Sequence, residues 1–330
     1  MRDKIIKRFR RILAPSEQYL EKQTVLNAQM LVKLNREIKQ WKTLLDVEFS
    51  GFSQWGEDGI IDWLIEHLPG LPRTFIEFGV EDYRESNTRL LLHLRNWRGL
   101  VMDGSDAHIS NIQAQDIYWR HDLTAKCAFI DRDNVNQLIS DADFSGDIGL
   151  LSVDIDGNDY WVWQAINVVN PAIVVCEYNA VFGDLRQLSV PYQADFQRTR
   201  AHHSNLYFGA SLPALVRLAR DKGYSFVGTT STGCNAFFVH NDYALLILNG
   251  LEEISTFPSS VRESRDEVGR LTFVGGTDRP KLIQDLPLID LETNLPTTLV
   301  GCGEIYSSNW KACLDSKRVS GKVEKVNVNS

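Results

Sequence analysis

The chain has 330 residues, of which 43% are hydrophobic and 24% are charged, enough to bury a full hydrophobic core. No window approaches the roughly 20 unbroken apolar residues of a membrane span, and the first residues lack the apolar segment of a signal peptide. Six basic residues and one acid give residues 1–13 a charge of +5, so the remaining chain carries −13 of the net −8. This acidic body argues against nucleic acid as a partner, and we expect a cytoplasmic protein.

The cysteines support neither a disulfide framework nor a zinc site. There are five of them, an odd number, scattered without a CxxC pair. Three lie in apolar runs, where cysteine behaves as a small hydrophobic residue. They are Cys127, Cys176, Cys234, Cys302 and Cys313.

Residues 1–50 differ from the rest of the chain. Apolar residues at helical spacing among lysines and arginines in residues 1–14 suit a helix on an anionic membrane surface, and a solvated helix fits equally well. After Pro15 we expect a long helix to about Asp46 with an apolar stripe. This helix either packs on its own domain, which we favour slightly, or pairs two subunits in a homodimer. The stripe consists of Leu31, Leu34, Ile38, Trp41 and Leu45.

Residues 51–250 alternate short apolar runs with amphipathic segments, which is typical of a parallel sheet with crossover helices. The strands are expected at 74–80, 99–103, 126–130, 148–154, 172–178, 225–228 and 235–240. The helices are expected at 57–67, 87–96, 135–140, 160–168 and 211–222. A short turn joins the last two strands, so they should form an antiparallel hairpin at one sheet edge. Residues 251–330 form a C-terminal extension, and 319–330 suggest a disordered tail.

Acidic residues follow five of the predicted strands. In an open α/β sheet ligands bind outside the carboxyl ends of the strands, so these acids should gather at one edge. A single acid there is usually a helix cap, but five strand ends in succession favour a site. The ends carry Glu77 with Gly79, Asp103, Asp131 with Asp133, Asp154 with Asp156, and Glu177.

Two familiar loop motifs are absent. The chain contains no GxxxxGK[ST] loop, and the first strand is not followed by GxGxxG, so a nucleoside triphosphate or nicotinamide dinucleotide is disfavoured. DIDGND at 154–159 is not a calcium loop, because Asp159 replaces the required glycine and Ala165 the bidentate glutamate. Asp103 stands where an acid would hold the hydroxyls of a ribose. Ser86 or Asn87 is placed to cap the helix after the first strand.

The runs SQWGEDGIIDWL, FIEFGVEDYRESNTRLL, NWRGLVMDG, LLSVDIDGNDYWVW and VVCEYNAVFG, taken in this order, resemble the FkbM-like group of bacterial S-adenosylmethionine-dependent methyltransferases and its sugar-modifying relatives. The resemblance covers about residues 52–242. It implies a Rossmann-like class I methyltransferase sheet of seven strands in the order 3-2-1-4-5-7-6, ending in the hairpin. The chain departs from the usual ExGxGxG pattern, with Glu81 and Tyr83 at the positions of the later glycines.

The resemblance also implies residue roles. Glu77, Gly79 and Val80 would line the methionine part of the cofactor, and Asp103 would bind its ribose. Asp131 would lie near the adenine, and Asp154 with Asp156 between cofactor and acceptor. Asn87 and Gly104 complete the cofactor set.

Two activation chemistries for an acceptor hydroxyl stay open. Asp154, Glu177 and Asn179 offer the oxygen ligands that magnesium prefers, as related O-methyltransferases do. Alternatively, Asp154 or Asp156 is a direct general base. His202 and His203, in the insertion after the fifth strand, are further candidates for the base, although exposed histidines without a role are more common. Aromatic residues here would stack on a sugar or serve packing: Trp161, Trp163, Tyr178, Phe182, Tyr192 and Tyr207.

The sequence thus predicts an S-adenosylmethionine-dependent O-methyltransferase that acts on a sugar hydroxyl of a surface glycan or secondary metabolite. Residues 1–14 would hold it at the inner membrane face. The alternative is a weakly active or inactive scaffold in glycan assembly, which the altered glycine loop favours. A nicotinamide oxidoreductase is disfavoured by the missing GxGxxG.

Overall fold

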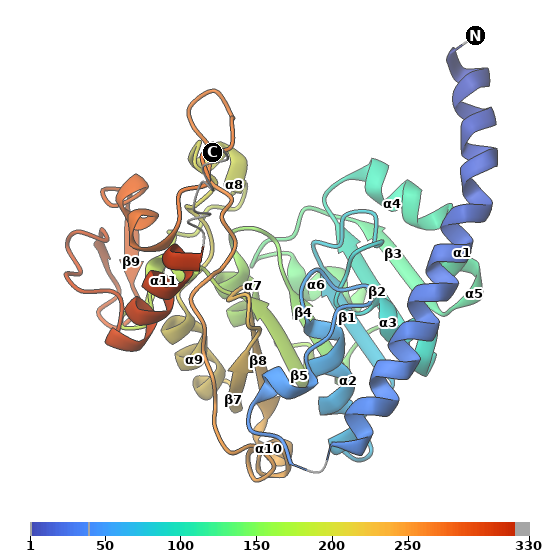
Figure 1. Ribbon diagram of the computed structural model, residues 1–330, viewed down its shortest axis with the longest axis horizontal. Helices are drawn as coiled ribbons and strands as arrows, with labels where there is room; N and C mark the ends of the chain where they lie inside the picture. The colour runs from blue at the N-terminus through green and yellow to red at the C-terminus, as the bar shows by residue number, and fades with distance from the viewer. Residues whose placement is uncertain (1, 39, 321–330) are drawn as a thin grey trace, which may run out of the picture.

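The computed structural model describes residues 2–38 and 40–320, with 2–17 and 316–320 described as backbone only. In this part of the chain the main sheet has seven strands in the order β3-β2-β1-β4-β5-β8-β7 (Figure 1). The first five are parallel, and β8 runs antiparallel to both β5 and β7. The strands are β1 Thr74–Phe78, β2 Arg98–Asp103, β3 Leu123–Cys127, β4 Gly146–Val153, β5 Val169–Glu177, β7 Tyr224–Thr229 and β8 Asn235–His240.

This order confirms the predicted fold class. The label β6 belongs to a two-residue strand, Leu188–Ser189, that joins a separate small sheet. Counted within the main sheet, the order is therefore 3-2-1-4-5-7-6 with a terminal antiparallel hairpin.

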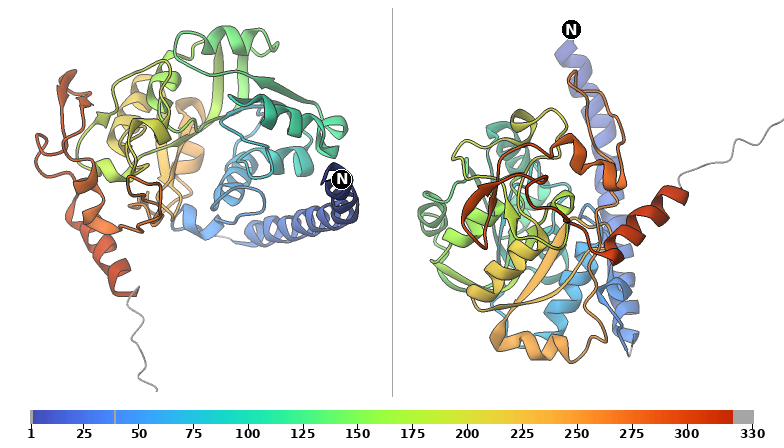
Figure 2. Two further views of the ribbon diagram at one scale, coloured as in Figure 1. Left: turned by 90° about the horizontal axis from the view of Figure 1, so that it is seen from above. Right: turned by 90° about the vertical axis from the view of Figure 1, so that its left-hand side faces the viewer.

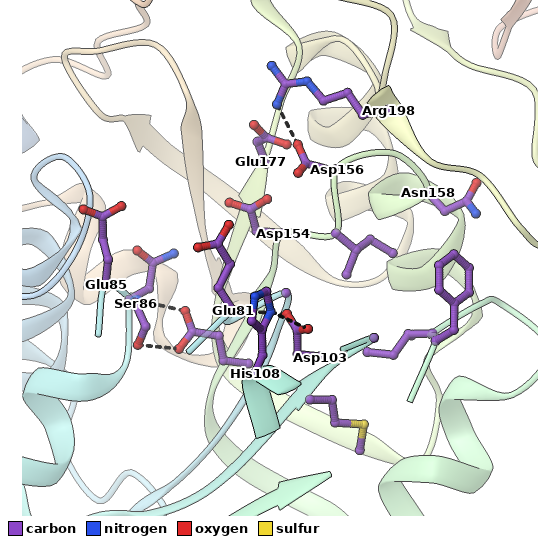
Figure 3. A pocket seen from close by; sticks show the side chains of 18 of the residues that line it. Glu81, Glu85, Ser86, Asp103, His108, Asp154, Asp156, Asn158, Glu177 and Arg198 are labelled. Atoms are coloured by element: carbon purple, nitrogen blue, oxygen red, sulfur yellow. Dashed lines mark hydrogen bonds and ion pairs between the residues drawn. The ribbon is translucent and has the colours of Figure 1, made fainter. Parts of the chain in front are cut away.

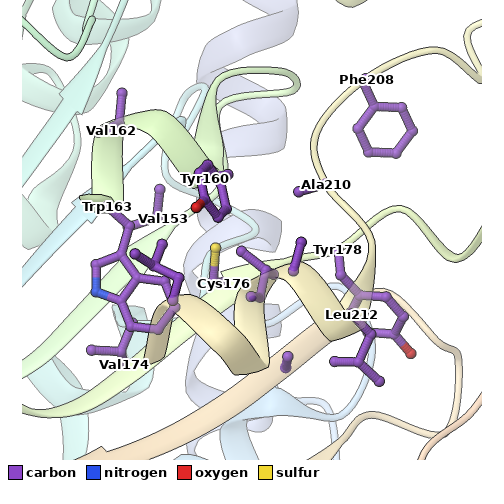
Figure 4. Close-up of a cluster of buried hydrophobic side chains, with 14 of the residues drawn as sticks. Val153, Tyr160, Val162, Trp163, Val174, Cys176, Tyr178, Phe208, Ala210 and Leu212 are labelled. Carbon is purple, nitrogen blue, oxygen red and sulfur yellow. The ribbon is translucent and has the colours of Figure 1, made fainter. Parts of the chain in front are cut away.

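Helices cover both faces of the sheet because alternate strand residues are apolar on each side. Phe75 packs with one hydrophobic cluster, whereas Ile76 and Phe78 pack with the other. In the cluster that contains Ile76 and Phe78, Trp163 lies against side chains of β5 (Figure 4). One face carries α2 Glu57–His67, α3 Arg89–Arg95, α4 Asp106–Gln113, α5 Asp116–Arg120 and α10 Asn241–Leu248, and the other α6 Val135–Ser140, α7 Asp159–Ala165 and α9 Leu212–Asp221.

The predicted third strand is displaced. The structure places it at Leu123–Cys127, paired in register with β2, and not at 126–130. Leu123 and Ala125 are the buried alternate residues of an edge strand. The more apolar run that follows, 128–130, is a loop at the strand's carboxyl end, so the richest apolar segment was mistaken for the strand.

The first helix, α1 Arg2–Glu37, runs on through Pro15 and extends beyond the body of the molecule (Figure 1). The prediction of a helix to Asp46 was wrong, because Thr43 and Asp46 form a capping box that starts a separate 3₁₀ helix, η1 Leu44–Val47. The buried face of α1 holds Ala28 and Val32, whereas Leu34 of the predicted stripe is 61% exposed.

Residues 251–320 fold onto the domain on the side opposite α1 (Figure 2). They contain η3 Gly276–Asp278, η4 Pro280–Leu282, β9 Leu288–Asp290, β10 Leu295–Thr297 and α11 Ser308–Ser320. β9 pairs with β6 of the insertion after β5, and Trp310 joins the main core. Of the predicted disordered tail, residues 319 and 320 end α11, and 321–330 lie outside the described residues.

Within the described residues, no helix combines the length and apolarity needed to cross a membrane.

Candidate functional site

A cavity of about 570 Å³ opens at the carboxyl ends of β1, β2, β4 and β5 (Figure 3). Its walls come from the loops after these strands, from residues 128–130, from the insertion that contains α8 Arg198–Ala201, and from the C-terminal extension. This is the edge at which the sequence predicted the acids to gather. Acids that end or follow β1, β2, β4 and β5 line the cavity, whereas those after β3 do not.

Gly79 fixes the closest approach between two of these loops. Its φ of +75° is a left-handed conformation, and a Cβ at this position would overlap the carbonyl oxygen of Asp154. Only glycine satisfies both conditions. Gly79 lines the cavity as predicted, whereas Val80 is buried beside it and is not part of the lining.

Glu77 holds the loop that leads into α3. Its carboxylate accepts hydrogen bonds from Ser86 Oγ at 3.1 Å, Asn87 N at 2.8 Å and Thr88 N at 3.2 Å, as well as from the Thr88 hydroxyl. Burial raises the pKa of Glu77 to about 7, against the lowering effect of these bonds. Asn87 in turn donates to Ser152 Oγ on β4 at 3.1 Å. Glu77 and Asn87 therefore fix the cavity wall between β1 and the start of α3.

The loop keeps a glycine-like course without the later glycines. Glu81 and Tyr83, which occupy their positions, have φ of +47° and +63°, a conformation that costs an ordinary residue about 1–2 kcal/mol. The Glu81 N–H donates to Asp103 Oδ2 at 2.9 Å, and the Tyr83 carbonyl accepts from Arg89 Nη1 at 2.7 Å. These bonds help to hold Glu81 and Tyr83 in a left-handed conformation that glycine adopts most readily.

Asp103 ends β2 and lines the cavity with Gly104, as predicted. Its Oδ1 accepts from Ser105 N at 2.8 Å and lies 3.0 Å from His108 Nδ1. Its side chain is 12% exposed, so the carboxylate is held rigidly while one edge meets the cavity. A fixed carboxylate after the second strand is suited to accept ribose hydroxyls.

Asp131 lies outside the cavity lining. Its Oδ1 accepts from the backbone N–H groups of Asp133 and Asn134, both at 2.8 Å, in the turn before α6. The displaced third strand explains this, because it brings 128–130 to the wall and carries Asp131 past it. Phe129, 47% exposed, is the aromatic surface there.

Three carboxylates converge after β4 and β5. One oxygen each of Asp154, Asp159 and Glu177 lies within 4.8 Å of the other two. Burial, followed by repulsion from neighbouring carboxylates, raises the pKa of Asp154 and of Glu177 well above the usual range, and Arg198 opposes the shift. Asp154 and Glu177 line the cavity and point toward each other (Figure 3).

The predicted magnesium set does not assemble. Asn179 caps η2 Ala180–Phe182 through its Oδ1, which accepts from Val181 N at 3.0 Å, and its amide nitrogen donates to two backbone carbonyls. Asp159 accepts from the N–H groups of Ile155 and Gly157 at 2.8 and 3.0 Å. The Arg198 guanidinium, which opposes the raised pKa of Asp154 and of Glu177, competes with a cation for these two carboxylates.

Arg198 is the main residue that the sequence did not single out. Its Nη1 donates to Asp156 Oδ1 at 2.6 Å (Figure 3). Its Nε donates to the Asn205 carbonyl at 2.8 Å, and its guanidinium lies 3.9 Å from the Phe208 ring centre. Asp156 itself adopts a φ of +55°. An arginine in a loop of unknown course carries no signal in one sequence, so only the fold places it here.

The predicted histidines do not reach the cavity. His202 Nδ1 lies 2.8 Å from Ser204 Oγ, and its ring centre lies 4.1 Å from that of His203, which is exposed, with the two rings tilted by 36°. Burial, with the His203 charge, lowers the pKa of His202. Neither belongs to the cavity lining. Glu263, from the C-terminal extension, lines it instead.

The aromatic residues expected to stack on a sugar mostly serve packing. Trp161 donates to the Val190 carbonyl at 2.9 Å, and Tyr192 lies over Arg132 at 3.8 Å. The others are buried in the core: Trp163, Tyr178, Phe182 and Tyr207. Among the described residues the aromatic side chains of the lining are Phe129 and Phe196.

The sheet order and the cavity together define a Rossmann-like α/β protein with the strand arrangement of class I methyltransferases. No protein-family model matches the sequence, and no curated protein matches it. Similar solved structures include the N-terminal domain of EvdMO1 with SAH bound (11% identity, 64% of this chain, 95% of that chain, TM-score 0.38) and the O-methyltransferase from Bacillus cereus in complex with SAH (12%, 68%, 95%, 0.35). Such identities and TM-scores are too low to support a statement on activity.

Proposed function

We propose that the protein transfers a methyl group from S-adenosylmethionine to a hydroxyl group of a sugar in a surface glycan or secondary metabolite. The observation that carries this proposal is the charge of the cavity at the carboxyl ends of the strands. Eight acids line it, against one arginine and one histidine. The acids are Glu77, Glu81, Glu85, Asp103, Asp154, Asp156, Glu177 and Glu263.

This charge selects among the ligands that such a sheet binds. S-adenosylmethionine carries a sulfonium and an ammonium group against one carboxylate, so it is a net cation and is attracted to an acidic cavity. Nucleoside triphosphates and nicotinamide dinucleotides are anions and would be repelled. The ribose would meet Asp103, the adenine the apolar wall at 128–130, and the methionine end the loop from Gly79 to Glu85.

The residues of this chain would supply the base. S-adenosylmethionine provides an activated methyl group, and the acceptor oxygen must be aligned with it and lose its proton. Asp154 follows β4 and Glu177 ends β5, so β1 lies between these two strands and β2, the strand that Asp103 ends. Because like charges this close do not both ionise readily, one of the two holds a proton and the other is a strengthened base. As the oxygen–carbon bond forms, the carbon–sulfur bond breaks, its electrons neutralise the sulfur, and the hydroxyl proton passes to the carboxylate.

The experiment is calorimetric titration of S-adenosylmethionine and S-adenosylhomocysteine into the wild type and Asp103→Ala. The matched control is Asp122→Ala, whose side chain is 72% exposed at the start of β3. We expect binding that falls at least tenfold in Asp103→Ala and is unchanged in the control. Absence of binding to the wild type would contradict the proposal and favour the inactive scaffold.

The direct base is preferred over magnesium because Asn179 is not free to coordinate. Once an acceptor has been found, activity should survive EDTA. Loss of activity with EDTA and recovery with magnesium would reverse this preference.

We also propose that the N-terminal helix mediates contact outside the domain, either with an anionic membrane face through residues 1–14 or with a second copy. The support is that Tyr19, Leu26, Met30 and Leu34 are each more than half exposed on α1. Deletion of residues 1–14 should abolish binding to anionic vesicles. Met30→Glu should leave vesicle binding unchanged and shift sedimentation toward the monomer if the helix pairs two subunits.

A further inference from the structure

The insertion after β5 and the C-terminal extension meet at one residue, Asn205. Its backbone carbonyl accepts from Arg198 Nε at 2.8 Å, and its Nδ2 donates to Glu263 Oε1 at 3.2 Å. Asn205 is 8% exposed and has a φ of +58°. A buried residue other than glycine keeps this conformation only when its surroundings hold it there. Asn205 thus ties Arg198 and Glu263 into one rigid wall of the cavity.

Other residues hold both side chains, Arg198 and Glu263, in place. Arg198 is fixed by Asn205, Asp156 and the ring of Phe208. Glu263 Oε1 also accepts from Arg265 Nε at 2.9 Å, and buried Arg279 donates to the Glu263 backbone carbonyl at 3.4 Å. Within the described residues, no hydrogen bond engages Arg198 Nη2 or Glu263 Oε2.

This leaves a donor and an acceptor on one wall of the cavity. Arg265, Asn205 and Arg198 lower the pKa of Glu263, so it is a carboxylate at neutral pH, and its charge balances that of Arg198. A hydroxyl group both donates and accepts, so a donor beside an acceptor matches two neighbouring hydroxyls. An anionic acceptor would face Asp154, Asp156, Glu177 and Glu263 together, whereas the one arginine here, Arg198, is already paired with Asp156.

We propose that Arg198 and Glu263 form the acceptor-binding wall, which recognises an acceptor that has neighbouring hydroxyl groups and no negative charge, and that Glu263 of the C-terminal extension determines its specificity. This inference rests on the proposed function for the choice of which end of the cavity holds the acceptor. The wall lies beside Asp156 and Glu177, on the side of the sheet away from Asp103.

The test compares Glu263→Gln with Glu267→Gln on the full chain. Glu267 is exposed, lies four residues further in the same extension and is outside the cavity lining. Saturation-transfer NMR would measure the binding of the methyl glycosides of glucose, galactose and mannose, with methyl glucuronide as the anionic probe and glucosamine as the cationic probe. Each protein is measured with and without S-adenosylhomocysteine.

We expect the wild type to bind at least one neutral glycoside more tightly than methyl glucuronide. Glu263→Gln should bind it about three- to tenfold more weakly, as for the loss of one charge-assisted hydrogen bond, with unchanged affinity for S-adenosylhomocysteine. Glu267→Gln should match the wild type. Deoxy derivatives of the bound glycoside should lose affinity in the wild type at two adjacent positions.

Equal binding in both variants, preference for the glucuronide, or equal affinity for all deoxy derivatives would overturn the inference. The deoxy series needs only the wild type, so it decides even where a variant fails to fold. Binding of neutral glycosides without any binding of S-adenosylhomocysteine would sink the methyl-transfer proposal and leave the acceptor wall standing.

Discussion

Glu77 allows a quantitative test of how burial and hydrogen bonding compete at the base of the cavity. Its side chain is 4% exposed, and burial raises its pKa from 4.5 to about 7 despite the bonds that it accepts. Because the folded-state pKa is the higher one, the folded protein binds more protons between the two values. The stability that Glu77 contributes is therefore full below about pH 4.5 and falls as the pH rises through 7.

The magnitude follows from the size of the shift. A shift of 2.5 pKa units corresponds to about 3 kcal/mol in total, of which about 2 to 3 kcal/mol is lost between pH 5 and pH 8. Glu77→Gln lacks this titration. We therefore expect the free energy of unfolding of the wild type, minus that of Glu77→Gln, to fall by about 2 to 3 kcal/mol between pH 5 and pH 8.

Urea unfolding followed by tryptophan fluorescence at the two pH values measures this difference, and the subtraction cancels the other buried acids. Glu292→Gln, an exposed substitution, is the control and should show no change with pH. A difference between wild type and Glu77→Gln that is the same at both pH values would refute the reasoning. It would mean that the hydrogen bonds to Glu77 balance the cost of its burial, so that its pKa is the same in the folded and unfolded states.

Three further substitutions test the cavity. Gly79→Ala should abolish binding of S-adenosylhomocysteine in calorimetry, because the new Cβ overlaps the Asp154 carbonyl oxygen; normal binding would show that the loop yields easily. Glu81→Gly should raise the free energy of unfolding by up to about 1 kcal/mol, since it relieves a left-handed conformation; a loss in urea unfolding would mean that the conformation is not strained. Arg198→Ala should move the acidic limb of the pH–rate profile to higher pH, because Arg198 lowers the pKa of Glu177, one of the two proposed bases; an unchanged profile would show that Arg198 does not act on the base.

The sheet was predictable because its signals are local. Each central strand is a short apolar run ended by a turn, and the order of such runs determines a parallel sheet. The one misplaced strand, β3, is an edge strand whose two buried residues, Leu123 and Ala125, are separated by a polar one, whereas residues 128–130 are three apolar residues in succession, of which only Ile130 is buried. Periodicity favours the longer apolar run, and only pairing with β2 decides against it. The misplacement affected the site prediction as well, since Asp131 was predicted to lie near the adenine and lies outside the cavity lining.

The candidate site likewise contains residues that the sequence could predict and residues that it could not. Asp103, Asp154 and Glu177 were predicted from their positions at strand ends, which the topology fixes. Arg198 and Glu263 were not, because their places depend on the course of the insertion and of the extension, and these segments lack a repeating pattern. The choice of His202 and His203 shows the limit, since the right segment was chosen and the wrong residues within it.

The two ends of the cavity differ in how strongly the sheet determines their geometry. The end near β1 and β2 is built from loops that directly follow strands of the sheet, so its geometry is fixed by the sheet. Such an end suits a ligand that is the same in every reaction, as a cofactor is. The other end is built from Arg198 and Glu263, which Asn205 joins across segments that the sheet does not constrain. Insertions and extensions change without disturbing the core, so an acceptor preference located there can change while the cofactor end stays fixed. Exchange of residues 251–320 between related chains should then transfer the acceptor preference and leave the affinity for S-adenosylhomocysteine unaltered.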